Sequence, residues 1–154
     1  MKGTQILLGN DAIAYGVLAS GASVVASYPG TPASEICETA YRVSKQEGLQ
    51  VHVEWSINEK TAFEVAYANA IAGRRSAVSM KQVGLNVASD PVMSAAYMGT
   101  VGGILLIVAD DPGPHSSQTE QDTRLFAMFA KLPVLDPSSP EEALRMAGDA
   151  FVFS

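Results

Sequence analysis

An apolar run in the second half of the chain constrains its fold more than any other feature. Residues 102–109 read GGILLIVA, without a polar side chain, and residues 110–124 (DDPGPHSSQTEQDTR) contain no Ala, Val, Leu, Ile or Met. A strand that is apolar on both faces is typical of a parallel sheet with helices on both sides. In such sheets, ligands bind on the loops at the carboxyl ends of the strands. The sequence therefore predicts an α/β fold with a polar, ligand-binding segment directly after this strand.

The rest of the chain alternates short strands with helices. We expect strands at 24–27, 51–54, 76–80 and 102–109, with shorter ones at 6–8 and 133–135. Helices are expected at 10–20, 31–47, from Ser56 or Asn58 to 72, 83–99, 119–131 and from 139 onward, with Asn10 and Thr31 as N-caps and Ser139 opening a capping box. About five strands with intervening helices predict a three-layer α/β domain, a doubly wound and mostly parallel sheet.

Composition excludes several classes of function. The net charge of −6, without a Lys/Arg stripe, argues against a nucleic-acid partner. The single cysteine, Cys37, excludes internal disulfides and a Cys-ligated cluster, and is expected to be a buried apolar residue of a helix. No apolar run reaches the roughly 20 residues of a membrane span, and the N-terminus lacks a signal-peptide pattern. We therefore expect a cytoplasmic protein without a membrane partner.

The end of the chain and its apolar content suggest a neighbouring domain. The last residues, Phe151-Val152-Phe153-Ser154, are more apolar than a usual C-terminus, and 47% of all residues are hydrophobic. We expect one domain over residues 1–154 that is a fragment of a longer multidomain chain.

The familiar phosphate-binding and hydrolase motifs are absent. The sequence has no G-x-G-x-x-G, no G-x-x-x-x-G-K-[ST] and no G-x-S-x-G. With only His52 and His115, and no His/Cys cluster, no metal site is predicted. Candidate chemistry therefore rests on the loops that follow the strands.

The first two of these loops have both a functional and a purely structural interpretation. In Tyr28-Pro29-Gly30-Thr31-Pro32, a hydroxyl at a helix N-terminus suits an anion such as a substrate carboxylate, although Thr31 would also serve as a simple N-cap. In residues 54–60 (EWSINEK), Glu59 lies in the first turn of a helix, and its spacing from Ser56 is that of a capping box.

The third and fourth loops also leave alternatives open. In residues 81–86 (KQVGLN), Gly84 lets a ligand approach the backbone closely, or simply serves a turn. Asp110 and Asp111 could bind a metal, but capping or solvation is the stronger interpretation. His115 is the histidine placed at a plausible site, and its alternative is an ordinary surface position.

Taken together, four motifs in this order resemble one family. YPGTPASEI, EWSINEKTAFEVA, MKQVGLNVASDP and DDPGPHSSQTEQDTR are similar to the pyrimidine-binding domain of thiamine-diphosphate-dependent 2-oxoacid:ferredoxin oxidoreductases. Within that family the likeness is nearest to the alpha subunit of the indolepyruvate enzymes, and it extends from residue 9 to residue 140. It implies the thiamine-diphosphate-binding fold, with that cofactor.

The resemblance also implies roles for individual residues. The family's catalytic glutamate hydrogen-bonds N1′ of the cofactor's aminopyrimidine ring and matches Glu59, which must be desolvated to make this donation as a neutral carboxyl. Thr31 matches a threonine that contacts the substrate carboxylate. The remaining expectations are Pro29 and His115 as substrate-binding residues and Gln82, Gly84 and Asn86 as cofactor-binding residues.

The resemblance finally implies partners. In this superfamily a second domain with a Gly-Asp-Gly motif holds the diphosphate and Mg²⁺, and this chain has only Gly148-Asp149-Ala150. Iron–sulfur clusters are likewise expected only elsewhere. The implied reaction is oxidative decarboxylation of aryl 2-oxoacids (indolepyruvate) to acyl-CoA, with ferredoxin and coenzyme A as partners, in a homodimer whose isolated domain is inactive. The alternatives are the pyrimidine-domain subunit of a split non-oxidative 2-oxoacid decarboxylase, and a non-catalytic module that retains the fold.

Overall fold

The centre of the molecule is a parallel sheet of four strands. The computed structural model describes residues 6–154, and its sheet has the order β2-β1-β3-β4, with every neighbouring pair parallel. The strands are β1 (Val24–Ser27), β2 (His52–Trp55), β3 (Ser76–Lys81) and β4 (Ile104–Ala109). The helices are α1 (Gly9–Ala19), α2 (Ser34–Glu47), α3 (Glu59–Ile71), α4 (Gln82–Met98), α5 (Thr123–Ala130) and α6 (Pro140–Phe153).

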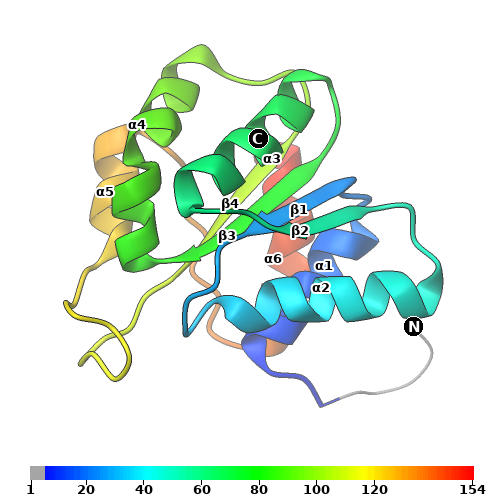
Figure 1. Cartoon of the computed structure of the whole chain (residues 1–154), viewed down its shortest axis with the longest axis horizontal. Coiled ribbons are helices and arrows are strands. Elements are labelled where there is room, and N and C mark those ends of the chain that lie inside the picture. The colour runs from blue at the N-terminus through cyan, green and yellow to red at the C-terminus, as the bar shows by residue number, and fades with distance from the viewer. Residues whose placement is uncertain (1–5) are drawn as a thin grey trace.

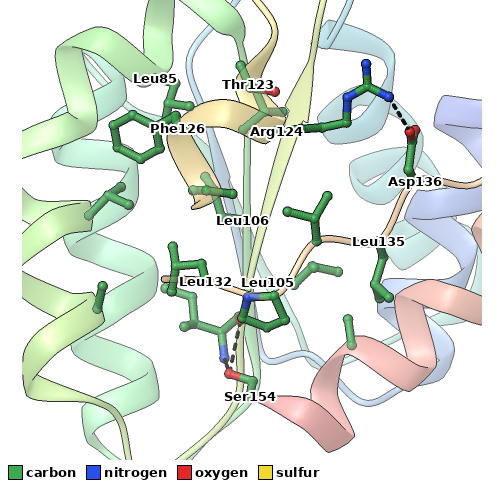
Figure 2. A pocket seen from close by; sticks show the side chains of 18 of the residues that line it. Leu85, Leu105, Leu106, Thr123, Arg124, Phe126, Leu132, Leu135, Asp136 and Ser154 are labelled. Atoms are coloured by element: carbon green, nitrogen blue, oxygen red, sulfur yellow. Dashed lines mark hydrogen bonds and ion pairs between the residues drawn. The ribbon is translucent and has the colours of Figure 1, made fainter. Parts of the chain in front are cut away.

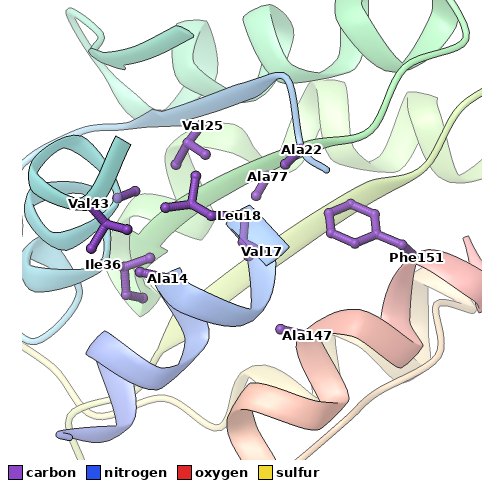
Figure 3. Close-up of a cluster of buried hydrophobic side chains, with 11 residues drawn as sticks. Ala14, Val17, Leu18, Ala22, Val25, Ile36, Val43, Ala77, Ala147 and Phe151 are labelled. Atoms are coloured by element: carbon purple, nitrogen blue, oxygen red, sulfur yellow. The ribbon is translucent and has the colours of Figure 1, made fainter. Parts of the chain in front are cut away.

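Helices cover both faces of this sheet, so the predicted three-layer, doubly wound architecture is confirmed. Helices α1, α2 and α6 lie on one face, and α3, α4 and α5 lie on the other (Figure 1). On the first face, α1 and α6 pack side chains against the strands, as Figure 3 shows for Val17, Val25, Ala77 and Phe151. The second core joins α3 and α4 to β3 through side chains such as Phe63, Val78 and Leu85.

Hydroxyl groups connect the two central strands inside the sheet. The Ser27 hydroxyl donates to the carbonyl of Ser79 (2.8 Å), and the Ser79 hydroxyl donates to Ser27 Oγ (2.9 Å). Both serines are completely buried. Because a buried hydroxyl is costly unless it is hydrogen-bonded, each serine satisfies the other and fixes β1 against β3.

Two predicted strands are wrong. Residues 6–8 and 133–135 lie within the described part of the chain and belong to no strand. Pro133 lacks an amide hydrogen for a ladder, and a cavity separates this segment from the edge of β4. Residues 6–8 lead directly into α1, where the Leu8 carbonyl accepts the amide of Ala12.

Two predicted N-caps are also wrong. Long-range hydrogen bonds engage the side chain of Asn10, and a tight turn keeps Thr31 outside α2. Asn10 lies inside α1, and its amide donates to the Pro32 carbonyl (2.7 Å) and to Glu35 (3.0 Å). Helix α2 begins at Ser34 because the Gly30 carbonyl accepts the amide of Ala33 (2.8 Å), which closes a turn over Thr31 and Pro32. The Thr31–Pro32 peptide is cis.

Helices α3, α5 and α6 begin at side-chain caps, whereas α4 begins at Gln82 without one. Asn58 caps α3 by accepting the amide of Thr61 (2.9 Å), so the capping-box role considered for Ser56 falls to Asn58. Helix α5 begins at Thr123 with Asp122 as its cap, later than the predicted residue 119. The start of α6 at Ser139 is confirmed, since its hydroxyl accepts the amide of Glu142 (3.2 Å).

Cys37 occupies the predicted buried position in α2. Its side chain is 1% exposed, and burial, followed by the nearby Glu38 and Glu54 charges, raises the pKa of the thiol to about 12. Because the thiolate is the reactive form, this cysteine is a packing residue.

The close approach of α1 to α6 depends on Gly16. A Cβ at this position would lie against the Leu144 carbonyl and 2.8 Å from the Ala147 Cβ. Gly16→Val is therefore expected to lower the free energy of unfolding by about 1–3 kcal/mol, the usual cost of overpacking. Urea unfolding measures this loss, with Gly9→Ala as the control because a Cβ there meets no atom within 4 Å. An unchanged midpoint for Gly16→Val would contradict this packing.

Candidate functional site

The candidate site lies where the chain reverses its direction across the sheet. From β1 the chain goes to β2 on one side, and from β3 it goes to β4 on the other. In open parallel sheets the loops diverge at such a point and leave a crevice at the carboxyl ends of the strands. Here the loop of residues 28–33 follows β1, and the first turn of α4 follows β3.

Glu59 is the first residue of α3 and contacts the start of α4. A Cβ on Gly84 would lie 2.6 Å from both Cγ and Oε1 of Glu59. The Glu59 side chain is therefore packed over the bare backbone of Gly84, and only glycine leaves this space. Glu59 is half-buried, and its carboxylate has no hydrogen-bonding partner among the described residues.

Gln82 begins α4 beneath the polar segment of residues 110–124. Its side chain is completely buried, and Nε2 donates to the Thr119 carbonyl (3.1 Å). The Oε1 atom is buried without a partner among residues 6–154. An unpaired buried carbonyl is costly, so this oxygen remains an acceptor without a donor, two residues before Gly84 on the same helix.

Asn86 joins the same helix to the polar segment. Its amide exchanges two hydrogen bonds with the amide of Gln121, at 2.7 and 3.0 Å. Asn86 is exposed, so this pair lies at the surface. The structure thus engages Asn86 in a contact that fixes the segment to α4.

Asp111 organises the segment from its beginning. Its carboxylate accepts the backbone amides of Ser116 (2.9 Å), His115 (3.1 Å) and Ser117 (3.0 Å). These hydrogen bonds, with Ser116 the largest contributor, hold the pKa of Asp111 well below its usual range. Asp110 accepts the amide and hydroxyl of Thr123 (2.9 and 3.1 Å) at the start of α5.

Both aspartates therefore have the capping role that the sequence favoured over metal binding. Within the described ranges, no group of three or more His, Cys, Asp or Glu side chains is placed to hold a metal ion. In the same part of the chain, no helix is long and apolar enough to cross a membrane.

The predicted substrate residues lie at the outer rim of the crevice. Pro29, Thr31 and His115 are exposed. The hydroxyl of Ser116 donates to the Thr31 carbonyl (3.0 Å), which connects the loop after β1 to the segment after β4. The structure thus brings Thr31 near His115 in space, although 84 positions separate them in sequence.

Lys81 was not singled out by the sequence analysis, but it lies between these loops. It ends β3, and its Cδ is 2.8 Å from where a Cβ on Gly30 would stand. Its Nζ lies 3.4 Å from the Ser116 carbonyl. A lone lysine at the end of a strand carries no motif, so only the spatial neighbours indicate a role.

A separate apolar cavity lies at the other side of the polar segment. It has a volume of about 970 Å³ and extends along the free edge of β4, beneath α5 and the segment at 132–136. Figure 2 shows Leu106 and Phe126 at this cavity, the Arg124–Asp136 ion pair (3.0 Å) at one end and Ser154 at the other. None of the predicted site residues lines it.

Comparison with known proteins agrees with this arrangement. A family model described as "Pyruvate flavodoxin/ferredoxin oxidoreductase, thiamine diP-bdg" matches residues 15–154. The chain belongs to this family. Thiamine diphosphate is thus the cofactor of the domain family, and the resemblance predicted from the four motifs is confirmed.

Similar proteins include indolepyruvate oxidoreductase subunits. The chain is 53% identical over 149 residues to "Indolepyruvate oxidoreductase subunit IorA" of Thermococcus kodakarensis, covering 97% of this chain and 23% of that protein. The subunit of the same name from Archaeoglobus fulgidus is 52% identical over 151 residues, covering 96% and 24%. The chain thus spans about a quarter of the length of these relatives.

A solved structure shares the fold. The 2-oxoglutarate:ferredoxin oxidoreductase from Magnetococcus marinus, solved with 2-oxoglutarate, coenzyme A and succinyl-CoA bound, superposes with a TM-score of 0.78 at 20% identity. The match covers 94% of this chain and 26% of that one. The thiamine-diphosphate-binding fold expected from the sequence is therefore confirmed.

The amide contacts of Asp111 generate a prediction about the polar segment. Asp111→Asn keeps the size of the side chain but replaces one acceptor oxygen with a donor that faces backbone N–H groups. Hydrogen exchange at the amides of residues 115–117 should become several-fold faster, whereas Asp149→Asn, which changes a half-exposed side chain on α6, should leave these amides unchanged. Equal protection in parent and Asp111→Asn would contradict the capping role.

The same contacts determine the dependence on pH. Because folding lowers the pKa of Asp111 below its ordinary 3.8, the carboxylate stabilises the segment fully at pH values above that ordinary value. The contribution is lost as the pH falls through the lower folded-state pKa. In the parent protein, protection of residues 115–117, corrected for intrinsic exchange rates, should therefore persist to strongly acidic pH.

Proposed function

We propose that this chain forms the pyrimidine side of a thiamine diphosphate site in an enzyme that oxidatively decarboxylates aryl 2-oxoacids. The substrate is indolepyruvate, the product an acyl-CoA, and the electron acceptor ferredoxin. Support comes from the family to which the chain belongs and from relatives named as indolepyruvate oxidoreductase subunits at 52–53% identity.

One observation carries the assignment of the catalytic residue. The carboxylate of Glu59 is half-buried, lies against the bare backbone of Gly84 and has no hydrogen-bonding partner among the described residues. A carboxyl that only structures a helix start would be engaged with backbone amides, and Asn58 already has that function. Glu59 is therefore free to bind a ligand in the crevice.

The neighbouring groups fit an aminopyrimidine ring. Such a ring offers a nitrogen that accepts a hydrogen bond and an amino group that donates one. Glu59 supplies a carboxyl for the first, and the unpaired Oε1 of Gln82 supplies an acceptor for a donor. Gly84 lets the backbone of α4 approach the ring closely. Asn86, which pairs with Gln121, borders this site from the next turn of the helix.

The chain's own residues then have distinct tasks. When bound, thiamine diphosphate supplies a carbon nucleophile and an electron sink for the decarboxylation of a 2-oxoacid. Glu59 holds a proton on its carboxyl and donates it in a hydrogen bond to N1′ of the pyrimidine. The Thr31 hydroxyl donates to the carboxylate of the substrate. Pro29 and His115 shape the substrate pocket and restrict water.

The rest of the site comes from partners. We propose that a second domain or subunit binds the diphosphate and Mg²⁺, and that iron–sulfur clusters, ferredoxin and coenzyme A belong to the complete enzyme. The domain extends over residues 1–154 of a longer chain, and the enzyme is a cytoplasmic homodimer. This chain matches only 23–24% of the length of each relative, which supports the proposal that other parts of the enzyme supply these groups.

The experiment that tests this function is Glu59→Gln in the complete enzyme. Glutamine keeps the size of the side chain but cannot hold the acidic proton, so turnover of indolepyruvate should fall at least about 100-fold. The assay follows reduction of ferredoxin in the presence of coenzyme A. Glu64→Gln, an exposed glutamate later on α3, is the matched control and should retain parent turnover. Near-parent turnover in Glu59→Gln would end the assignment.

Gly84→Ala tests the contact between Glu59 and Gly84 by changing the glycine. The added Cβ would lie 2.6 Å from Cγ and Oε1 of Glu59, and the flexible glutamate would move away from the ring. We expect turnover to fall about 10-fold or more, because small displacements of a catalytic group are costly. Titration of the enzyme with thiamine diphosphate should show weaker binding, whereas Gly9→Ala should match the parent enzyme. Unchanged turnover and affinity would show that Gly84 is not part of the site.

A further inference from the structure

We propose that Lys81 is a substrate-binding residue whose ammonium group binds the carboxylate of the 2-oxoacid. The inference rests on the proposed function and deepens it. It assigns to the substrate carboxylate a cation from the end of the central strand β3, beside the loop that carries Thr31.

The first support is the position of Lys81 in the fold. It is the last residue of β3, at the point where the loops after β1 and β3 diverge. Its aliphatic stem lies against Gly30, where a Cβ would meet its Cδ at 2.8 Å and its Cγ at 3.2 Å. The bare backbone of Gly30 therefore guides the ammonium group along the loop that carries Thr31.

The second support is the charge of the rim. The four loops at the carboxyl ends of the strands contain three Lys or Arg residues, at 60, 81 and 124. Lys60 is paired with Asp90 at 2.9 Å, and Arg124 is paired with both Asp122 (2.9 Å) and Asp136 (3.0 Å).

Lys81 differs from these two cations. Among the described residues it has no carboxylate within 4.0 Å, and its Nζ reaches only the Ser116 carbonyl at 3.4 Å. Like Lys60 it is half-buried, whereas Arg124 is exposed. An ammonium without a counter-ion is more available to an anion than a cation already paired with a carboxylate.

The third support is the distance to the catalytic contact. Lys81 caps α4, and Gly84, against which Glu59 lies, is in the first turn of that helix. Along the axis of α4, residues 81 and 84 are separated by about 5 Å, close to one helical turn. In a 2-oxoacid the carboxylate is bonded directly to the reacting carbonyl carbon. The spacing thus suits a substrate whose carboxylate binds Lys81 while its carbonyl meets the cofactor.

The carbonyl of Ser116 gives the ammonium a second partner. Decarboxylation turns the bound carboxylate into neutral CO₂, which leaves Lys81 without its anion. The Ser116 carbonyl oxygen, 3.4 Å from Nζ, can then accept a hydrogen bond from the ammonium again. Lys81 therefore acts on substrate binding, and its loss should change KM more than kcat.

The experiment uses the complete enzyme with Lys81→Met, Lys81→Arg and, as matched control, Lys60→Met. Indolepyruvate serves as the substrate, and indole-3-acetone, in which a methyl group replaces the carboxylate, serves as the neutral ligand. For Lys81→Met we expect KM for indolepyruvate to rise about 10- to 100-fold, the usual weight of a hydrogen bond to a charged group, with a much smaller change in kcat. Lys81→Arg should restore most of the affinity, and Lys60→Met should stay within about twofold of the parent.

Binding of the neutral ligand distinguishes a loss of charge recognition in Lys81→Met from a general disruption of the site. Inhibition by indole-3-acetone and the affinity for thiamine diphosphate should be the same in parent and Lys81→Met. Gly30→Ala, whose Cβ would displace the Lys81 stem, should raise KM in the same way and tests the proposal if Lys81→Met does not assemble.

The outcomes separate this inference from the proposed function. A parent-like KM in Lys81→Met, or an equal loss for indolepyruvate and indole-3-acetone, would overturn the role of Lys81. If Glu59→Gln is inactive while Lys81→Met and Gly30→Ala bind indolepyruvate normally, only this inference fails. If Glu59→Gln turns over normally, the proposed function itself fails.

Discussion

The parallel pairing of β1 with β3 is the constraint on which the site depends, because it brings together the two loops that form the crevice. Ser27 is in register with Ser79, and their buried hydroxyls are hydrogen-bonded to each other. The chain leaves these neighbouring strands in opposite directions across the sheet. The loop with Thr31 and the first turn of α4 must therefore lie at the same edge and diverge there.

Glycine then decides which side chains enter this crevice. Gly84 leaves room for Glu59, and Gly30 leaves room for Lys81, at contact distances that a Cβ would prevent. In both cases a long charged side chain lies over bare backbone, which limits its freedom without adding a counter-charge. Neither charged group has an ion-pair partner among the described residues. Both groups are therefore positioned by packing and remain available to a ligand.

The sequence predicted the layers of the fold well because they depend on local periodicity. The apolar run before Asp110 and the alternation of strands and helices require a sheet covered on both faces. The sequence failed where a long-range contact decides the local structure. Asn10 has the side chain of a cap but binds the Pro32 carbonyl across the domain, and a tight turn from Gly30 keeps Thr31 outside α2.

The candidate site, like the fold, could be predicted from the sequence only in part. The likeness of four motifs predicted candidate residues, including Glu59 and Gln82, but no pattern in the sequence links Glu59 to Gly84 or Lys81 to Gly30. Those contacts arise only when α3 and α4 pack on one face of the sheet and when β1 pairs with β3. Lys81 was overlooked because an isolated lysine has no motif, and its significance depends on the absence of a nearby carboxylate, which is a property of three dimensions.

The polar segment after β4 shows why a loop without regular structure can form part of a binding site. Asp111 holds three successive backbone amides, Asp110 holds the start of α5, and Asn86 and Gln121 join the segment to α4. Ser116 connects it to the loop of Thr31. Because these hydrogen bonds hold the backbone of the segment, less of the interaction energy with a ligand is lost to conformational entropy. The same hydrogen bonds fix the backbone at residue 115 and leave the side chain of His115 at the surface of the segment.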